Sequence, residues 1–230
     1  MLNLTISVSV NRFLKNWGRL LASKKYLFSL FLSLMIWAAG YIFYRQVIVY
    51  VDNLKGLPTV GDLLLDMLPI VDLRYVYAYS IVVIMAMIWV YVIFLRPDLL
   101  PFGLKFFAFV FIVRAAFITF THLGPPVGFL IPSFASEFTV WPFNDLMHSN
   151  DLFFSGHVAY PFMGALMLRH SKVMFYLLLV CSILMGVTVL LMRIHYTIDV
   201  AAAFFIVYGI YAAVKKVFGP MDLSFYKLTR

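Results

Sequence analysis

The feature that most constrains this chain is a series of apolar stretches, each near the length of a membrane-crossing helix. Such a helix needs about 20 mostly apolar residues. Only 12% of the 230 residues are charged and 64% are hydrophobic, which is more apolar surface than a soluble fold of this size can bury. We therefore predict an all-α, polytopic membrane protein with a six-transmembrane-helix bundle. The predicted spans are Tyr26–Tyr44, Tyr75–Leu95, Phe102–Thr121, Phe154–Leu168, Val173–Met192 and Thr197–Val214.

The basic residues are distributed unevenly between the two sides of these spans. Because basic loops stay in the cytoplasm, the richer side is predicted to be cytoplasmic, with both termini on it. Eight of the ten acidic residues fall on the opposite, outer side. Thirteen of the eighteen basic residues lie on the side of the termini: Arg12, Lys15, Arg19, Lys24, Lys25, Arg96, Lys105, Arg169, Lys172, Lys215, Lys216, Lys227 and Arg230.

The first 25 residues are basic and amphipathic, and no cleavable signal peptide is expected. A helix over 12–23 would suit the surface of an anionic inner leaflet, although a segment that only fixes topology would fit as well. Its apolar face would carry Phe13, Leu14, Trp17, Leu20 and Leu21. We divide the chain into an amphipathic cytoplasmic segment (1–25), a transmembrane catalytic domain (26–216) and a cytoplasmic tail (217–230).

Two connections on the outer side, 45–74 and 122–153, are long. Both mix Gly and Pro with many apolar residues, whereas a solvated loop would be more polar. We expect them to fold back as a partly buried cap over the outer ends of the spans. The fourth span is short and contains Pro161 and Gly164, so its start should be buried in protein rather than in lipid.

The outer ends of the spans collect ionisable residues, which are costly in a membrane and therefore suggest a function. With their immediate neighbours they come from three places: Asp151, Ser155, Gly156 and His157 at the fourth span, Arg193, His195, Tyr196 and Asp199 at the sixth, and Arg114 in the third with His122 just after its end.

His195 and Asp199 are four residues apart and therefore share one face of a helix. The carboxylate can hold the proton of one ring nitrogen and leave the other nitrogen free as a nucleophile or base. His157 comes from another helix and can protonate a departing oxygen, while arginines can hold phosphate oxygens. Gly156 would let backbone N–H groups approach an anion. This set predicts phosphate chemistry.

Two other chemistries fit part of the set. Both histidines with Asp199 could bind zinc, but arginines in the same place would repel a cation. Ser155 could serve as a hydrolytic nucleophile, but it lacks the strand–turn–helix context of such serines. We therefore expect neither a metal nor another cofactor.

Two segments, Asn150–His157 (NDLFFSGH) and His195–Val200 (HYTIDV), resemble the signature motifs of the sphingomyelin synthase family. That family belongs to the type 2 phosphatidic acid phosphatase superfamily. Phe154 resembles the synthase branch, because the phosphatase branch usually has proline there and carries a Lys-x6-Arg-Pro motif that this chain lacks. Residues 114–126 and 69–72 match the other synthase motifs more loosely. With the six-span layout, the resemblance extends over most of the chain.

The resemblance implies a ping-pong transfer at the outer leaflet. His195 would attack the phosphorus of a phospholipid donor and carry the head group as phosphohistidine, oriented by Asp199. His157, supported by Asp151, would protonate the diacylglycerol oxygen and then activate a lipid alcohol, either ceramide or diacylglycerol. The implied partners are these membrane lipids. No nucleic acid is expected, and the resemblance is compatible with a homo-oligomer. Phosphate and substrate binding would fall to Arg193, Arg114, Ser155, Gly156, His122 and Tyr196.

Three other functions remain open at this point. In a lipid phosphate phosphatase or phospholipase C-type hydrolase, water would replace the acceptor, but the apolar outer connections and Phe154 favour transfer. A non-catalytic lipid binder or carrier would keep its activity when either histidine is replaced. A channel is disfavoured because the charged residues gather at one end and do not line a full-length path.

Overall fold

The computed structural model describes residues 2–130 and 150–229, and all regular secondary structure in these two ranges is helical. The part of the second outer connection at 131–149 lies outside the described residues. Five helices are long and apolar enough to cross a membrane, which indicates a multi-pass membrane protein. They are α2 (Lys24–Asp52), α4 (Arg74–Leu95), α5 (Leu100–Thr121, preceded by the 3-10 turn η1, Pro97–Leu99), α7 (Lys172–Leu191) and α8 (Thr197–Asp222).

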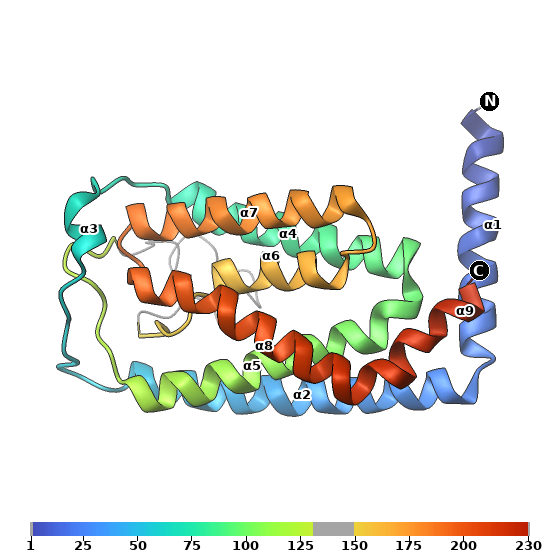
Figure 1. Ribbon diagram of the computed structural model, residues 1–230, viewed down its shortest axis with the longest axis horizontal. Helices are drawn as coiled ribbons and strands as arrows, with labels where there is room; N and C mark the ends of the chain where they lie inside the picture. The colour runs from blue at the N-terminus through green and yellow to red at the C-terminus, as the bar shows by residue number, and fades with distance from the viewer. Residues whose placement is uncertain (1, 131–149, 230) are drawn as a thin grey trace.

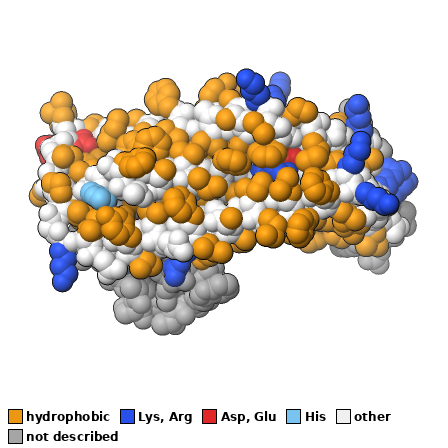
Figure 2. Space-filling model, turned by 90° about the horizontal axis from the view of Figure 1, so that it is seen from below, with side chains coloured by type: hydrophobic (Ala, Val, Ile, Leu, Met, Phe, Trp, Pro, Cys, Tyr) orange, Lys and Arg blue, Asp and Glu red, His pale blue; other side chains and the backbone are white. Residues whose placement is uncertain are grey.

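These long helices lie side by side along one axis, and smaller elements close the two ends (Figure 1). At one end, which we call the inner end, α1 (Leu2–Leu21) lies across the long axis, beside both chain termini. At the opposite, outer end lies the short helix α3 (Leu63–Met67). Figure 2 shows apolar side chains along most of the visible face, with Lys and Arg gathered toward the inner end. This distribution matches a lipid-facing belt with a basic end.

The fourth predicted span forms a helix that is shorter than those of the other spans. Helix α6 (Gly156–Met167) has 12 residues and is therefore about 18 Å long, less than the 30 Å of a hydrocarbon core. It packs among α4, α5, α7 and α8. Phe154 and Ser155, just before it, are fully buried, so the prediction that this start is buried in protein is confirmed. At Gly164, a Cβ would lie 2.5 Å from Ile88 Cδ1, which explains the glycine there.

Two helices run further than the sequence indicates. Helix α2 continues past Tyr44 to Asp52 because Val47, Ile48 and Val51 pack into the core, so the charge of Arg45 does not end it. Helix α8 continues past Val214 to Asp222 and is followed by η4 (Leu223–Phe225) and α9 (Tyr226–Thr229). Residues 217–229 of the predicted tail are therefore helical, and Asp222 and Phe225 are buried against the bundle.

Candidate active site

Seven buried side-chain atoms in the described part of the chain have no hydrogen-bond partner. Buried polar groups in folded proteins are nearly always paired, so such atoms suggest a place built for a ligand. They are His122 Nε2, Asp151 Oδ1, Ser155 Oγ, His157 Nε2, Arg193 Nε, His195 Nδ1 and Asp199 Oδ1. All seven belong to residues that the sequence places in the candidate site.

The two sequence motifs meet through their backbones. The Ser155 amide donates to the Asp199 carbonyl, with 3.2 Å between N and O, and this bond joins the start of α6 to the first turn of α8. His195 Nδ1 lies 3.5 Å from Asp199 Oδ2, an ion-pair distance that could shorten when substrate binds. The same carboxylate oxygen accepts the Tyr196 amide at 3.0 Å, which fixes the carboxylate at the helix N-terminus.

His157 reaches the same place from α6. Its ring stacks on Tyr77 of α4, with 3.9 Å between ring centroids and 22° between the planes. The backbone bond between Ser155 and Asp199 brings the start of α6, which carries His157, next to the turn that carries His195. Tyr77 thus orients one of the predicted catalytic groups, a contact that the sequence analysis missed.

Arg114 is occupied by protein partners rather than turned toward an open site. Its Nη1 donates to Asp151 Oδ2 at 2.7 Å and to the Tyr44 hydroxyl at 2.6 Å. Its Nε donates to the Phe154 carbonyl at 2.7 Å, and its Nη2 donates to the Asp151 carbonyl at 3.2 Å. The guanidinium therefore pairs the carbonyls of the non-helical segment before α6, which lies in the bundle interior and cannot obtain partners from lipid.

Asp151 has the same partners. Its Oδ2 accepts hydrogen bonds from Arg114 and from the Tyr44 hydroxyl at 2.6 Å, whereas the family resemblance implies that Asp151 supports His157. Its Oδ1 is one of the unpartnered atoms. Gly156 lies beside this pair, and a Cβ there would come within 3.3 Å of Arg114 Cζ. Arg114 and Asp151 thus fix the segment that precedes α6, and the absence of a side chain at Gly156 leaves space for the guanidinium.

Arg193 connects the second motif to the outer connections. Its backbone has φ 54°, which a non-glycine residue rarely adopts, in the turn between α7 and α8. Its Nη2 donates to the Leu65 carbonyl at 2.7 Å, and its Nη1 donates to the Val127 carbonyl at 3.3 Å. The Arg193 side chain therefore bridges two outer segments next to His195.

Tyr196 and His122 lie at the edge of the cluster. The Tyr196 hydroxyl donates to the Gly124 carbonyl at 3.0 Å and accepts the Val60 amide at 3.3 Å. His122 ends α5 at φ 25°, and its ring lies 5.7 Å from that of Tyr50. Tyr196 therefore ties both outer connections to the second motif. The contacts of His122 lead away from His195 and toward α2.

Asp62, an outer acidic residue that we did not assign to the site, holds the start of α8. Its carboxylate accepts the Thr197 amide at 2.6 Å and the Thr197 hydroxyl at 2.8 Å, and it also caps α3. Burial would raise the pKa of this carboxyl, but the hydrogen bonds from Thr197 and the α3 amides outweigh it and keep the pKa below its usual range. In the sequence, Asp62 is recognisable only as an acidic residue within a long connection, which does not indicate a contact with α8.

The outer segments close over the cluster. The Gly124 amide donates to the Pro58 carbonyl at 2.9 Å, and the Val71 amide donates to the Leu191 carbonyl at 2.9 Å. The prediction that the first connection folds back onto the bundle is confirmed by these bonds and by those of Asp62. In this conformation Asp199 and Ser155 are 0% exposed and His195 is 2% exposed, so the candidate site is shielded from solvent.

In the described part of the chain, no three His, Cys, Asp or Glu side chains converge as metal ligands would. The convergent groups are two histidines, two carboxylates and a hydroxyl, with Arg114 and Arg193 alongside them. Such a set can move protons and stabilise an anion. No family model matches the chain, and a comparison with curated proteins finds no match either. Function is therefore inferred from the residues of the site itself.

Proposed function

We propose that the protein is a phospholipid head-group transferase that moves a phospho-head group to a lipid alcohol, either ceramide or diacylglycerol, through a phosphohistidine. The observation that carries this proposal is the gathering of the unpartnered buried atoms on His157, His195, Asp199 and their neighbours. The resemblance of the two motifs to the sphingomyelin synthase family adds support, because both motifs meet at this point.

In the first step, His195 Nε2 attacks the phosphorus of the donor, because Nδ1 faces Asp199. An N–P bond forms, the P–O bond to the glycerol breaks, and the departing oxygen takes a proton from His157. In the second step, His157 removes the proton of the acceptor hydroxyl, whose oxygen attacks phosphorus as the N–P bond breaks. Asp199 stabilises the imidazolium form of His195 during both steps.

The phosphoryl oxygens need cationic partners in both steps. Arg193 has an unpartnered buried Nε, and its other nitrogens are bonded to backbone carbonyls, so it is the better candidate for direct phosphate contact. Arg114 makes four hydrogen bonds to protein groups and acts as a positioning residue for the segment before α6. The sequence assigns both arginines to phosphate, and their different contacts support different roles.

The shielding of the site favours transfer over hydrolysis. Water competes with the acceptor for a phosphohistidine, so a transferase benefits from a site that closes without admitting water. The burial of His195, Ser155 and Asp199 under the outer segments fits that requirement. A lipid phosphate phosphatase or phospholipase C-type hydrolase, which would need water at the same place, is the alternative that the test must separate.

We also propose how the protein sits in its membrane. The five long helices and α6 would make six crossings, with α6 completed by the buried segment before it. The basic inner end would face the cytoplasm with both termini, and the site would face the outer or luminal leaflet. Helix α1, lying across the bundle axis, would rest on the inner leaflet (Figure 1). A membrane-impermeant cysteine label on single-cysteine variants at each end would test this orientation.

The function is tested by incubating purified protein with a phospholipid labelled in its head group, with and without ceramide or diacylglycerol. We expect label in a new lipid only when the alcohol is present, together with acid-labile label on the protein. Cys181, on α7 and outside the set of candidate site residues, offers a control as Cys181→Ala. Release of a water-soluble head group without a lipid product would replace the proposal with the hydrolase.

A further inference from the structure

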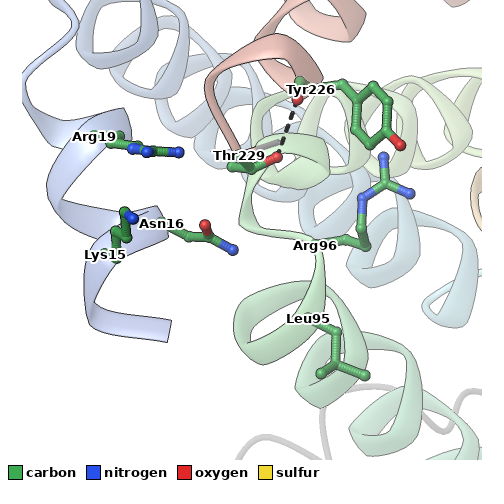
Figure 3. Close-up of a pocket in the computed structure, with 7 residues that line it drawn as sticks. All are labelled: Lys15, Asn16, Arg19, Leu95, Arg96, Tyr226 and Thr229. Carbon is green, nitrogen blue, oxygen red and sulfur yellow. Dashed lines mark hydrogen bonds between the residues drawn. The ribbon is translucent and has the colours of Figure 1, made fainter. Parts of the chain in front are cut away.

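A second polar site lies at the inner end, far along the bundle from the candidate active site. A pocket of about 440 Å³ opens between α1, the end of α4 and α9. Its lining residues are Lys15, Asn16, Arg19, Leu95, Arg96, Tyr226 and Thr229. Figure 3 shows Asn16 and Arg19 projecting from α1 toward the side that carries Arg96 and Tyr226. Three cations thus converge on one cavity from two separate parts of the chain.

The pocket has fixed walls. Trp17 of α1 donates its ring N–H to the Ile93 carbonyl at 3.1 Å, and the Phe13 ring stacks on Phe94 with centroids 5.2 Å apart. These contacts hold α1 against the end of α4. Arg96 is held by Asp98, with Nη2 and Oδ2 2.8 Å apart, and its guanidinium lies 4.9 Å from the centroid of the Tyr226 ring. The cation of Arg96 is therefore oriented before any ligand arrives.

The chemistry of the lining selects a phosphate group. Guanidinium and ammonium groups with amide and hydroxyl donors form charge-assisted hydrogen bonds to phosphate oxygens. The side chains next to the pocket are apolar and exposed: Leu14 and Leu95 are 59% and 60% exposed, and Phe94 is 53% exposed. A ligand with a phosphate and attached acyl chains would satisfy both surfaces, whereas a free phosphate would use only the first.

We propose that this pocket binds the phosphate of an anionic membrane lipid, whose acyl chains run along Leu14, Phe94 and Leu95. The bound lipid bridges α1 to α4 and α9 and holds α1 against the bundle. This site is independent of the proposed transfer reaction, because α1 and α9, which line it, lie at the opposite end of the bundle from the start of α8 (Figure 1).

The test uses the full-length protein in zwitterionic lipid nanodiscs, titrated with phosphatidylglycerol and read by native mass spectrometry and by thermal unfolding. We expect retained anionic lipid and a higher melting temperature. The variant Lys15→Gln/Arg19→Gln should weaken phosphatidylglycerol binding about tenfold or more, because each cation near a lipid surface contributes about 1 kcal/mol. The control Lys24→Gln/Lys25→Gln removes two exposed charges that do not line the pocket, and it should change binding less than twofold.

Three outcomes would overturn the proposal. Equal loss in the two variants would mean that the inner end only attracts anionic surfaces in general. An equal effect of inorganic phosphate at the same concentration would mean that the acyl chains play no part. Equal retention of phosphatidylcholine would mean that the cations do not select the ligand. Lys15 and Arg19 are exposed, and circular dichroism and thermal unfolding of the variants without added lipid check that the fold is kept.

Discussion

Two of the buried ion pairs in the described part of the chain lie near opposite ends of the bundle, and they differ in what surrounds them. At the inner end, Lys105 Nζ lies 2.8 Å from Asp222 Oδ2 and 2.8 Å from the Ser29 hydroxyl, and both charged side chains are 0% exposed. At the outer end, Arg114 Nη1 lies 2.7 Å from Asp151 Oδ2. In the described part of the chain, every unpartnered buried side-chain atom lies with the outer pair.

The comparison separates two uses of buried charge. A buried pair whose hydrogen bonds are all made stabilises a particular packing, and removal of one partner is costly. Polar atoms left without partners lower stability, so a protein retains them where they have another purpose. The inner pair therefore joins α2, α5 and α8, whereas the outer pair supports a segment whose neighbours are arranged for chemistry.

The largest expected effect is the loss of activity at the outer end. His195→Ala should lower head-group transfer by a factor of about 10⁴ or more, because it removes the proposed nucleophile, and His157→Ala by about 10²–10⁴. Transfer of labelled head group per folded protein is the measurement, with thermal unfolding as the control. Normal transfer in either variant would leave a non-catalytic lipid binder as the better explanation.

The next effect concerns the outer pair. Asp151→Asn should destabilise the protein by about 3–5 kcal/mol, because it leaves Arg114 buried without its counter-charge. The double variant Arg114→Met/Asp151→Leu should regain part of that stability but stay inactive, since the Phe154 and Asp151 carbonyls lose their donor. Denaturant unfolding and transfer are measured on the same samples. An active double variant would contradict the positioning role of Arg114.

The inner pair should give the opposite result for activity. Asp222→Asn should also cost about 3–5 kcal/mol, because Lys105 then stays buried without an opposite charge. The double variant Lys105→Met/Asp222→Leu should fall within about 1–2 kcal/mol of the native chain and keep full transfer per folded protein. If this double variant folds normally but loses transfer, the two pairs do not differ as we argue.

The smallest effect is expected at Asp62. Asp62→Asn should lower transfer about tenfold and stability by about 1–2 kcal/mol, because Thr197 and the α3 amides lose a charged acceptor. Since the pKa of Asp62 is depressed in the fold, its contribution is present above the ordinary Asp pKa of about 3.9 and is lost as the pH falls through the lower value. Asp72→Asn, in the same connection and outside these contacts, is the matched control.

Asp72 suits that comparison because its partner is local. Its carboxylate pairs with Arg74 two residues away, and both side chains are substantially exposed. Such exposed pairs contribute little to stability. If Asp72→Asn reduces transfer as much as Asp62→Asn does, the effect belongs to the charge of the whole connection rather than to the contact with Thr197.

Much of the fold could be predicted because lipid imposes simple rules on sequence. The apolar stretches predicted the long helices and a short, buried fourth one, although α6 runs through Pro161 and Gly164 without the interruption that these residues suggest. The ends of helices were less predictable: Arg45 and Lys215 looked like boundaries, yet packing of Val51 and Phe225 carries helical structure past them. Lys105 was counted among the inner loop charges, but it is buried and paired with Asp222. This pairing could not be predicted, because Asp222 is distant in the sequence.

The candidate site could be predicted only in part, because some of its residues belong to local sequence patterns and others do not. His157, His195 and Asp199 carry recognisable local patterns, so they could be selected from the chain alone. Tyr44, Tyr77 and Asp62 have no such pattern, because each matters only through a residue far away in sequence: Asp151, His157 and Thr197 respectively.

The sequence by itself determined the class of protein, the apolar helices, the uneven charge and the set of reactive side chains. These follow from local composition, because a lipid environment and a catalytic task each restrict which residues can occur. Only the tertiary structure decided which charges pair and which atoms stay unpartnered. It pairs Arg114 with Asp151 and leaves one ring nitrogen of His195 and one of His157 without a hydrogen bond. Pairing depends on contacts between distant segments, and these exist only once the helices have packed.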